Sequence, residues 1–177
     1  MGRKMFHSLA RSLLAAGYTT FTVVAATPAP ARLQGECWWS AGQSAPEPRV
    51  EAATFDSDGR LYMLGGFYPF PTVTKRIHRY EPTSDTWVDL RDMPVALTHS
   101  MPALHGRRAW FAGGFQGNHP GAAVPTVWIY DLDLDSWSQG PPLPTAVAAT
   151  GLVRVGQTLH SFGGVLADRD TVPGAHW

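Results

Sequence analysis

The apolar residues of this chain fall in short runs that are separated by turn-forming sequences. Leu97–Leu104 is one such run, with little charge, and His105–Arg107 forms a turn before the next run, Ala109–Ala112. Runs of this length that alternate with Gly-containing turns are typical of β-hairpins. The pattern therefore predicts short antiparallel strands.

The same succession occurs in the preceding segment and begins again near Ala146. Each unit is expected to contain four strands, with a loop such as Phe115–Pro125 after the second. The expected strands are Val50–Phe55, Leu61–Leu64, Ile77–Tyr80 and Thr86–Asp89 in the first unit, and Leu97–Leu104, Ala109–Ala112, Thr126–Tyr130 and Trp137–Gln139 in the second.

Several residue types keep a common period of 48 to 50 residues. Four strands per unit, packed side by side around an axis, form a propeller blade. Paired glycines then end a strand where another backbone comes close, and large aromatics pack between blades. The periodic residues are Gly65, Gly113 and Gly163, each followed by a second glycine; Trp39, Trp87 and Trp137; Tyr80 and Tyr130; and Pro46, Pro94 and Pro144.

Composition and charge exclude several classes of protein and of binding site. The chain has 18 Gly, 15 Pro, 11% aromatic and 16% charged residues, which excludes a disordered chain and disfavours a helical bundle. Lys plus Arg and Asp plus Glu number 14 each, so no net charge favours nucleic acid or an anionic membrane. The single cysteine, Cys37, excludes an intrachain disulfide and a thiolate-cluster zinc site.

These residues resemble the kelch repeat, whose motif is a glycine pair, then a tyrosine, then a tryptophan. Here the motif is Gly65–Gly66, Tyr80 and Trp87, and it recurs 48 to 50 residues later. The resemblance covers about Cys37–Trp177. It implies an all-β, kelch-type β-propeller of four-stranded antiparallel blades. Kelch propellers serve as scaffolds, ligand binders and enzyme frames, so the resemblance does not select an activity.

The N-terminus differs from the rest of the chain. Residues Met1–Gln34 contain no Asp or Glu, and a basic start precedes apolar and then small residues. This pattern predicts a signal peptide over residues 1–31, with a mature chain that starts between Thr27 and Gln34 and is secreted or periplasmic. An organellar transit peptide and a disordered tail are the alternatives.

The propeller domain is expected over residues 37–177, with units at about 47–96, 97–146 and 147–177, the last incomplete. Propellers have typically 4 to 8 blades, and fewer than three are expected here. Open blade edges expose apolar faces. We therefore expect either the N-terminal part of a longer propeller or a ring closed by self-association of two or more copies.

The start of each inner strand is the first candidate binding region. Positions five residues beyond the periodic prolines are Glu51, His99 and Ala149, which differ while the surrounding frame repeats. In kelch propellers, ligands commonly bind at one mouth of the central channel. We expect Glu51 and His99 to approach each other there and to contact a polar ligand or perform acid–base chemistry. The alternative is two solvated channel residues. Arg49 is a further candidate.

The loops after the glycine pairs form the second candidate region. Aromatic residues with polar neighbours in such loops stack on sugars or bind peptides. The alternative is that they pack over the blade. The candidate ligand-binding residues of these loops are Phe67, Tyr68, Phe115, Gln116 and Asn118.

No catalytic motif is recognisable, and the histidines lack metal-binding spacing. We therefore expect no catalytic residue, metal or cofactor in this chain, no membrane span and no nucleic-acid partner. The predicted function is a non-catalytic binding module with a protein or carbohydrate ligand at the channel mouth. The alternative is part of a carbohydrate-active propeller enzyme that resembles galactose oxidase or sialic-acid mutarotase.

Overall fold

The computed structural model describes residues 39–177, of which Ala41–Trp177 form one compact unit. The predicted targeting segment and Cys37 lie outside the described residues. The unit is built from strands and connecting loops, as predicted. Over residues 39–177, no helix is long and apolar enough to cross a membrane.

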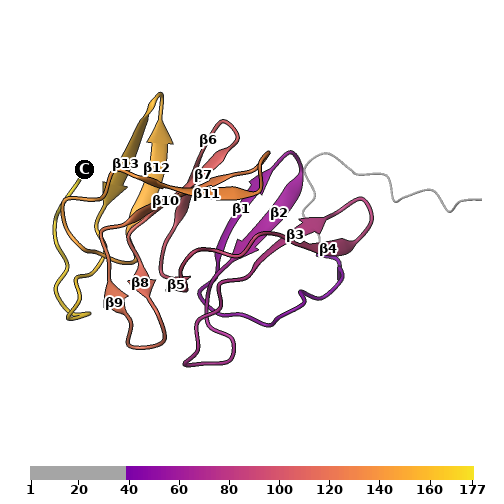
Figure 1. Ribbon diagram of the computed structural model, residues 1–177, viewed down its shortest axis with the longest axis horizontal. Helices are drawn as coiled ribbons and strands as arrows, with labels where there is room; N and C mark the ends of the chain where they lie inside the picture. Colours follow the sequence, from indigo (N-terminus) through magenta and orange to yellow (C-terminus); the bar gives the residue numbers. More distant parts are fainter. Residues whose placement is uncertain (1–38) are drawn as a thin grey trace, which may run out of the picture. The chain divides into compact units, whose positions relative to one another are not determined.

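Three of the four sheets of the described residues follow one another along the chain as blades, and each is antiparallel (Figure 1). The first contains β1 (Ala53–Ser57), β2 (Arg60–Leu64), β3 (Ile77–Glu81) and β4 (Thr86–Asp89), paired in that order. The second contains β6 (Pro102–His105), β7 (Arg108–Ala112), β10 (Val127–Asp131) and β11 (Ser136–Gly140). The third contains β12 (Gly151–Val155) and β13 (Thr158–Phe162).

The last two residues pair with β13 in the third sheet. The backbone amide and carbonyl of Trp177 each bond to Ser161 at 2.9 Å, and His176 bridges Phe162. The third sheet therefore follows the strand order of the first two.

The sheets lie side by side in chain order, and their first strands, β1, β6 and β12, are neighbours (Figure 1). Ser100 and Thr150 form a parallel bridge, and the Ala149 amide donates to the His99 carbonyl at 2.8 Å. Parallel inner strands from successive sheets are the arrangement that blades around an axis require. The fold is therefore an arc of kelch-type blades.

The expected strand Leu97–Leu104 is broken, contrary to the prediction. Its first part is β5 (Leu97–Thr98), which pairs with β8 (Phe115–Gln116); β8 in turn pairs with β9 (Ala122–Ala123). The break falls at His99, whose φ is 55°. This left-handed conformation turns the chain out of the blade. The residues before the break therefore pair with the loop after the glycine pair and form a separate small sheet with it.

The seam between the first and second sheets is a tight aromatic core. Phe111 of β7 and Tyr130 of β10 are almost fully buried there with Tyr62, Leu64 and Ile77 of the first sheet. Burying each such side chain stabilises the fold by about 1.5–3 kcal/mol. The repeated aromatics therefore hold adjacent blades together.

The first glycine in each of the first two pairs makes a close approach to the neighbouring blade. A Cβ added to Gly65 would lie 2.3 Å from the Leu97 carbonyl oxygen, and one on Gly113 would lie 2.2 Å from the Val147 oxygen. Both carbonyls belong to the segment that begins the next unit. The sequence-based explanation of these glycines is thereby confirmed.

The motif tyrosine and tryptophan fix the segment that links successive sheets. The Tyr130 hydroxyl donates to Asp135 Oδ1 at 2.6 Å, and the Arg91 amide donates to the same oxygen at 2.9 Å. Trp137 Nε1 donates to the Arg91 carbonyl at 3.3 Å. Burial, together with the bond to Asp135, raises the pKa of Tyr130 well above its usual range. Asp135 thus joins Tyr130 and Trp137 in holding this segment in place.

Candidate ligand-binding site

Glu51 and His99 lie together, each in the segment just before a first strand, β1 for Glu51 and β6 for His99. His99 Nε2 is 3.3 Å from Glu51 Oε2, although 48 residues separate them in sequence. His99 Nδ1 lies 3.0 Å from the Thr98 hydroxyl, and the ring meets the face of Phe115 edge-on, with centroids 5.1 Å apart. Both side chains remain partly exposed. The pair can therefore offer a carboxylate and an imidazole to a polar ligand.

The backbone at this position is strained in every unit. Glu51, His99 and Ala149 have φ values of 57°, 55° and 56°. A left-handed conformation costs a non-glycine residue about 1–2 kcal/mol. Strain of this kind persists where the surrounding structure imposes it, and it clusters at binding sites. The end of the compact unit that carries these three residues is called here the mouth end.

Arg49 lies beside this position but is not exposed. Its guanidinium is fully buried and donates to the Arg76 carbonyl at 2.8 Å and to the Glu47 carboxylate at 3.0 Å. It also donates to Nδ1 of His78 at 2.5 Å. The repeat places Leu97 at the corresponding position of the second unit. The structure thus gives Arg49 a structural role in a buried polar cluster.

His78 is the second buried member of this cluster. Because Nδ1 accepts a hydrogen bond from Arg49, that nitrogen carries no proton. Nε2 lies 2.9 Å from Asp89 Oδ1. Burial, and then the adjacent Arg49 charge, lower the pKa of His78 below its usual value. The first unit therefore holds a neutral histidine in its interior.

The predicted loop residues divide into two groups. Phe67 and Phe115 are buried, and Asn118 Oδ1 accepts from the Val73 amide at 2.9 Å, which ties the second loop to the first. Tyr68 and Gln116 are exposed, and so is Asn118 despite this hydrogen bond. Of the five loop candidates, Tyr68, Gln116 and Asn118 are therefore the ones that reach the surface.

Two further loop residues extend this surface. Phe70 is 65% exposed, and its ring centroid lies 5.3 Å from that of Phe67 and 5.4 Å from that of His119. Phe67, Phe70 and His119 are called here the aromatic patch. Phe70 and His119 each precede a proline in the loop after a glycine pair, which is the sequence feature that they share.

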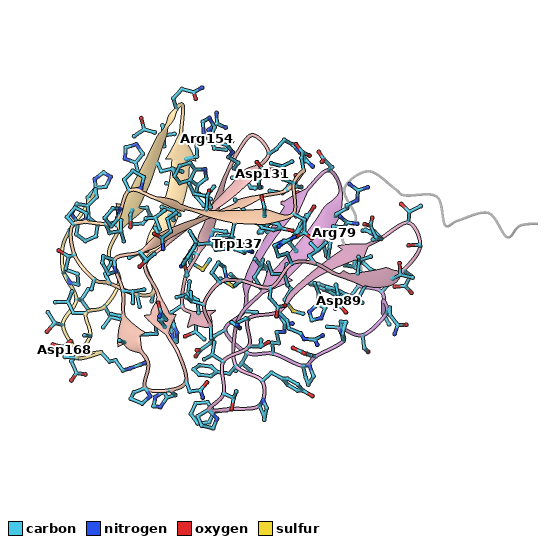
Figure 2. The ribbon with its side chains drawn as sticks, viewed as in Figure 1. Arg79, Asp89, Asp131, Trp137, Arg154 and Asp168 are labelled. Atoms are coloured by element: carbon cyan, nitrogen blue, oxygen red, sulfur yellow. The ribbon has the colours of Figure 1, made fainter. Side chains whose placement is uncertain are left out.

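The mouth end is one continuous region of the unit. The Phe67 amide donates to the Val50 carbonyl at 2.9 Å, which places the aromatic patch next to Glu51. Arg169, from the third loop, stacks 3.6 Å above the Phe115 ring and donates to the Pro120 carbonyl. In Figure 2, Asp168 of this loop and Arg154 of β12 lie at opposite ends of the third sheet. The loops and the β12–β13 turn therefore occupy separate ends.

Over the part of the chain that the structure describes, no group of three or more His, Cys, Asp or Glu side chains is placed to hold a metal ion.

The comparisons with known proteins agree with the fold and the motif. The sequence model of the Kelch motif matches residues 48–94 and 111–144. Kelch-like protein 23 of Homo sapiens is 26% identical over 110 residues, which cover 61% of this chain and 19% of that protein. Kelch-like protein terF of Aspergillus terreus is 26% identical over 131 residues, 67% of this chain and 28% of that protein. A solved structure of YjhT matches with a TM-score of 0.65 at 20% identity and covers 72% of this chain and 48% of that one.

The matched residues therefore carry the Kelch motif, and the described part of the chain is an arc of kelch-type β-propeller blades. The matched region spans less than a third of either curated relative, and about half of the solved YjhT structure.

Proposed function

We propose that this chain is a non-catalytic binding module that holds a segment of a partner protein at its mouth end. The observation that carries the proposal is the Glu51–His99 pair at the same end as exposed Tyr68 and Phe70, whose loop is joined to the Glu51 segment by the Phe67–Val50 backbone bond. Charged and aromatic side chains that surround a partner segment commonly dominate the binding energy. The relatives are named kelch-like proteins, and protein interaction is the use that such relatives suggest for this surface.

Partner selection from a displayed peptide library tests the proposal. Selected peptides are expected to bind the wild-type chain and to bind Glu51→Gln and Phe70→Ala at least about tenfold more weakly, which corresponds to about 1.4 kcal/mol. Leu134→Ala is the matched control because Leu134 is exposed in the β10–β11 turn. Peptides that are insensitive to both mouth-end variants, or the absence of any selected peptide, would count against the proposal.

A carbohydrate ligand is the second candidate, and one observation favours it. The Phe70 ring is largely exposed and lies 5.4 Å from the His119 ring, and aromatic faces stack on sugar rings. A glycan array separates the two candidates. A glycan signal that Phe70→Ala abolishes would support the carbohydrate, and an empty array together with selected peptides would support the protein partner.

We also propose that the chain is exported, on the basis of the acid-free, basic N-terminal sequence. The residues concerned lie outside the described part of the structure. N-terminal sequencing of the exported protein is expected to begin between Thr27 and Gln34; exported protein that begins at Met1 would contradict this.

A further inference from the structure

A small cavity lies beside the Glu51–His99 pair, in the seam between the first and second sheets. One side of its wall is polar and carries Glu51, Thr98, His99 and Ser100. The other side is apolar and comes from both sheets and from the segment that joins them, so the cavity belongs to a seam whose two sheets are complete. The apolar residues are Ala53, Leu64, Met93, Leu97 and Phe111.

Ser100 brings an unused hydrogen-bonding group to this cavity. The residue is 5% exposed, and its Oγ is buried without a hydrogen-bond partner among residues 39–177. A buried hydroxyl in this state costs free energy, because its bond to water in the unfolded chain is not replaced in the folded one. A buried polar atom without a partner, next to a candidate binding pair, points to a ligand atom that completes the bond.

The Glu51 carboxylate is oriented through one of its two oxygens. Its Oε2 lies 3.3 Å from His99 Nε2, and His99 Nδ1 lies 3.0 Å from the Thr98 hydroxyl. When the Thr98 hydroxyl donates to Nδ1, Nε2 carries the ring proton and donates to Glu51. Over the described residues no partner is found for Oε1 of Glu51. His99 is therefore a positioning residue, and Glu51 Oε1 and Ser100 Oγ remain as acceptors.

These acceptors suit a compact cation. The Glu51 side chain is 45% exposed, so its negative charge is accessible to a ligand that arrives from solvent. Divalent metal ions take more ligands than this site offers, whereas an ammonium group donates three hydrogen bonds. The cavity has room for about one water-sized group, which an ammonium matches and a planar guanidinium exceeds.

The third unit lacks the charged part of this arrangement. Thr150 occupies the position of Ser100 in the repeat, and its hydroxyl is likewise buried without a partner among the described residues. The residue before it is Ala149, where the first two units carry Glu51 and His99. Thr150 is therefore a matched control for Ser100, at the same repeat position but without an ionisable neighbour there.

We propose that the mouth end recognises a lysine side chain of the partner segment, whose ammonium donates to Glu51 Oε1 and Ser100 Oγ while His99 holds the carboxylate. The inference rests on the proposed binding of a protein segment and names the side chain that the segment carries. Hydrogen bonds between ionised groups are stronger than those between neutral ones, so this lysine is expected to contribute strongly to binding.

Titration of the full 177-residue chain with n-butylammonium chloride, followed by amide chemical shifts, tests the site without a partner. n-Butylammonium reproduces the end of a lysine side chain, n-butanol is its neutral counterpart, and sodium chloride matches the ionic strength. Saturable shifts at Glu51, His99 and Ser100 are expected with n-butylammonium alone, and Glu51→Gln is expected to weaken binding at least about tenfold. No saturable shifts, or equal shifts with either control compound, would overturn the proposal.

Ser100→Ala separates ligand binding from a structural role. Because the hydroxyl has no partner among the described residues, its removal is expected to leave the urea-unfolding midpoint unchanged or to raise it, while n-butylammonium binds several-fold more weakly. Thr150→Val, which is nearly isosteric, is expected to leave binding unchanged. A lower midpoint for Ser100→Ala, unchanged binding, or equal weakening by both variants would count against the proposal.

Peptides selected from the displayed library separate this inference from the proposed function. They are expected to share a lysine, and its replacement by norleucine or arginine is expected to weaken binding to the wild-type chain at least about tenfold but binding to Glu51→Gln much less. Peptides that bind without a lysine would overturn the lysine proposal and leave the binding module standing. If no peptide is selected, the binding module fails, and the n-butylammonium titration still decides whether the site exists.

Discussion

Replacing Gly113 by alanine tests the contact that the repeat imposes between successive blades. The substitution places a methyl group 2.2 Å from the Val147 carbonyl oxygen, in a backbone conformation with φ of 68°. The left-handed conformation costs alanine about 1 kcal/mol or more, and forcing atoms into a packed seam costs about 1–3 kcal/mol more. The free energy of unfolding is therefore expected to fall by about 2–4 kcal/mol.

Urea unfolding followed by tryptophan fluorescence measures this loss. Gly106→Ala is the control because Gly106 has a φ of 61° and open space around it, so only the conformational cost of about 1 kcal/mol applies. All variants are compared at one protein concentration, because association shifts apparent stability. Equal losses for Gly113→Ala and Gly106→Ala would refute the reasoning.

Three other predictions concern the core and the buried polar cluster. Tyr130→Phe removes the hydrogen bond to Asp135 and is expected to lower the free energy of unfolding by about 1 kcal/mol in urea titrations; an unchanged free energy would contradict this. Phe111→Ala empties a fully buried site and is expected to cost about 3–5 kcal/mol in the same assay; a loss below 1 kcal/mol would show that the seam is not packed as described. Because the pKa of His78 is lowered in the folded state, the unfolded chain binds the proton more readily, and stability is expected to fall as the pH drops below about 6.5. His78→Gln is expected to flatten that decline in thermal melts between pH 7 and pH 5, and an identical pH slope for both proteins would contradict the prediction.

Sequence periodicity predicted the sheets because each blade repeats the same contacts. The glycine pairs could be explained in advance, since three copies in register demand a common structural reason. The proximity of Glu51 and His99 followed from equal offsets in adjacent units, and the structure places them 3.3 Å apart. Their role toward a ligand remains a prediction.

Other features depended on tertiary packing that the sequence does not reveal. Arg49 was predicted at the mouth, yet its burial depends on His78, 29 residues further along, which accepts its hydrogen bond. Phe67 and Phe70 occupy the same loop with similar neighbours, but the bridge to Val50 buries the first and leaves the second exposed. Side-chain exposure within one loop is decided by such backbone pairings.

The mouth-end site is tested most directly by mapping a bound ligand onto the chain. We expect amide chemical-shift changes on adding a selected peptide to cluster at Glu51, His99, Tyr68, Phe70 and Gln116. Changes confined to the hairpin turns at the opposite end, such as the turn between β6 and β7, would contradict the proposed binding surface.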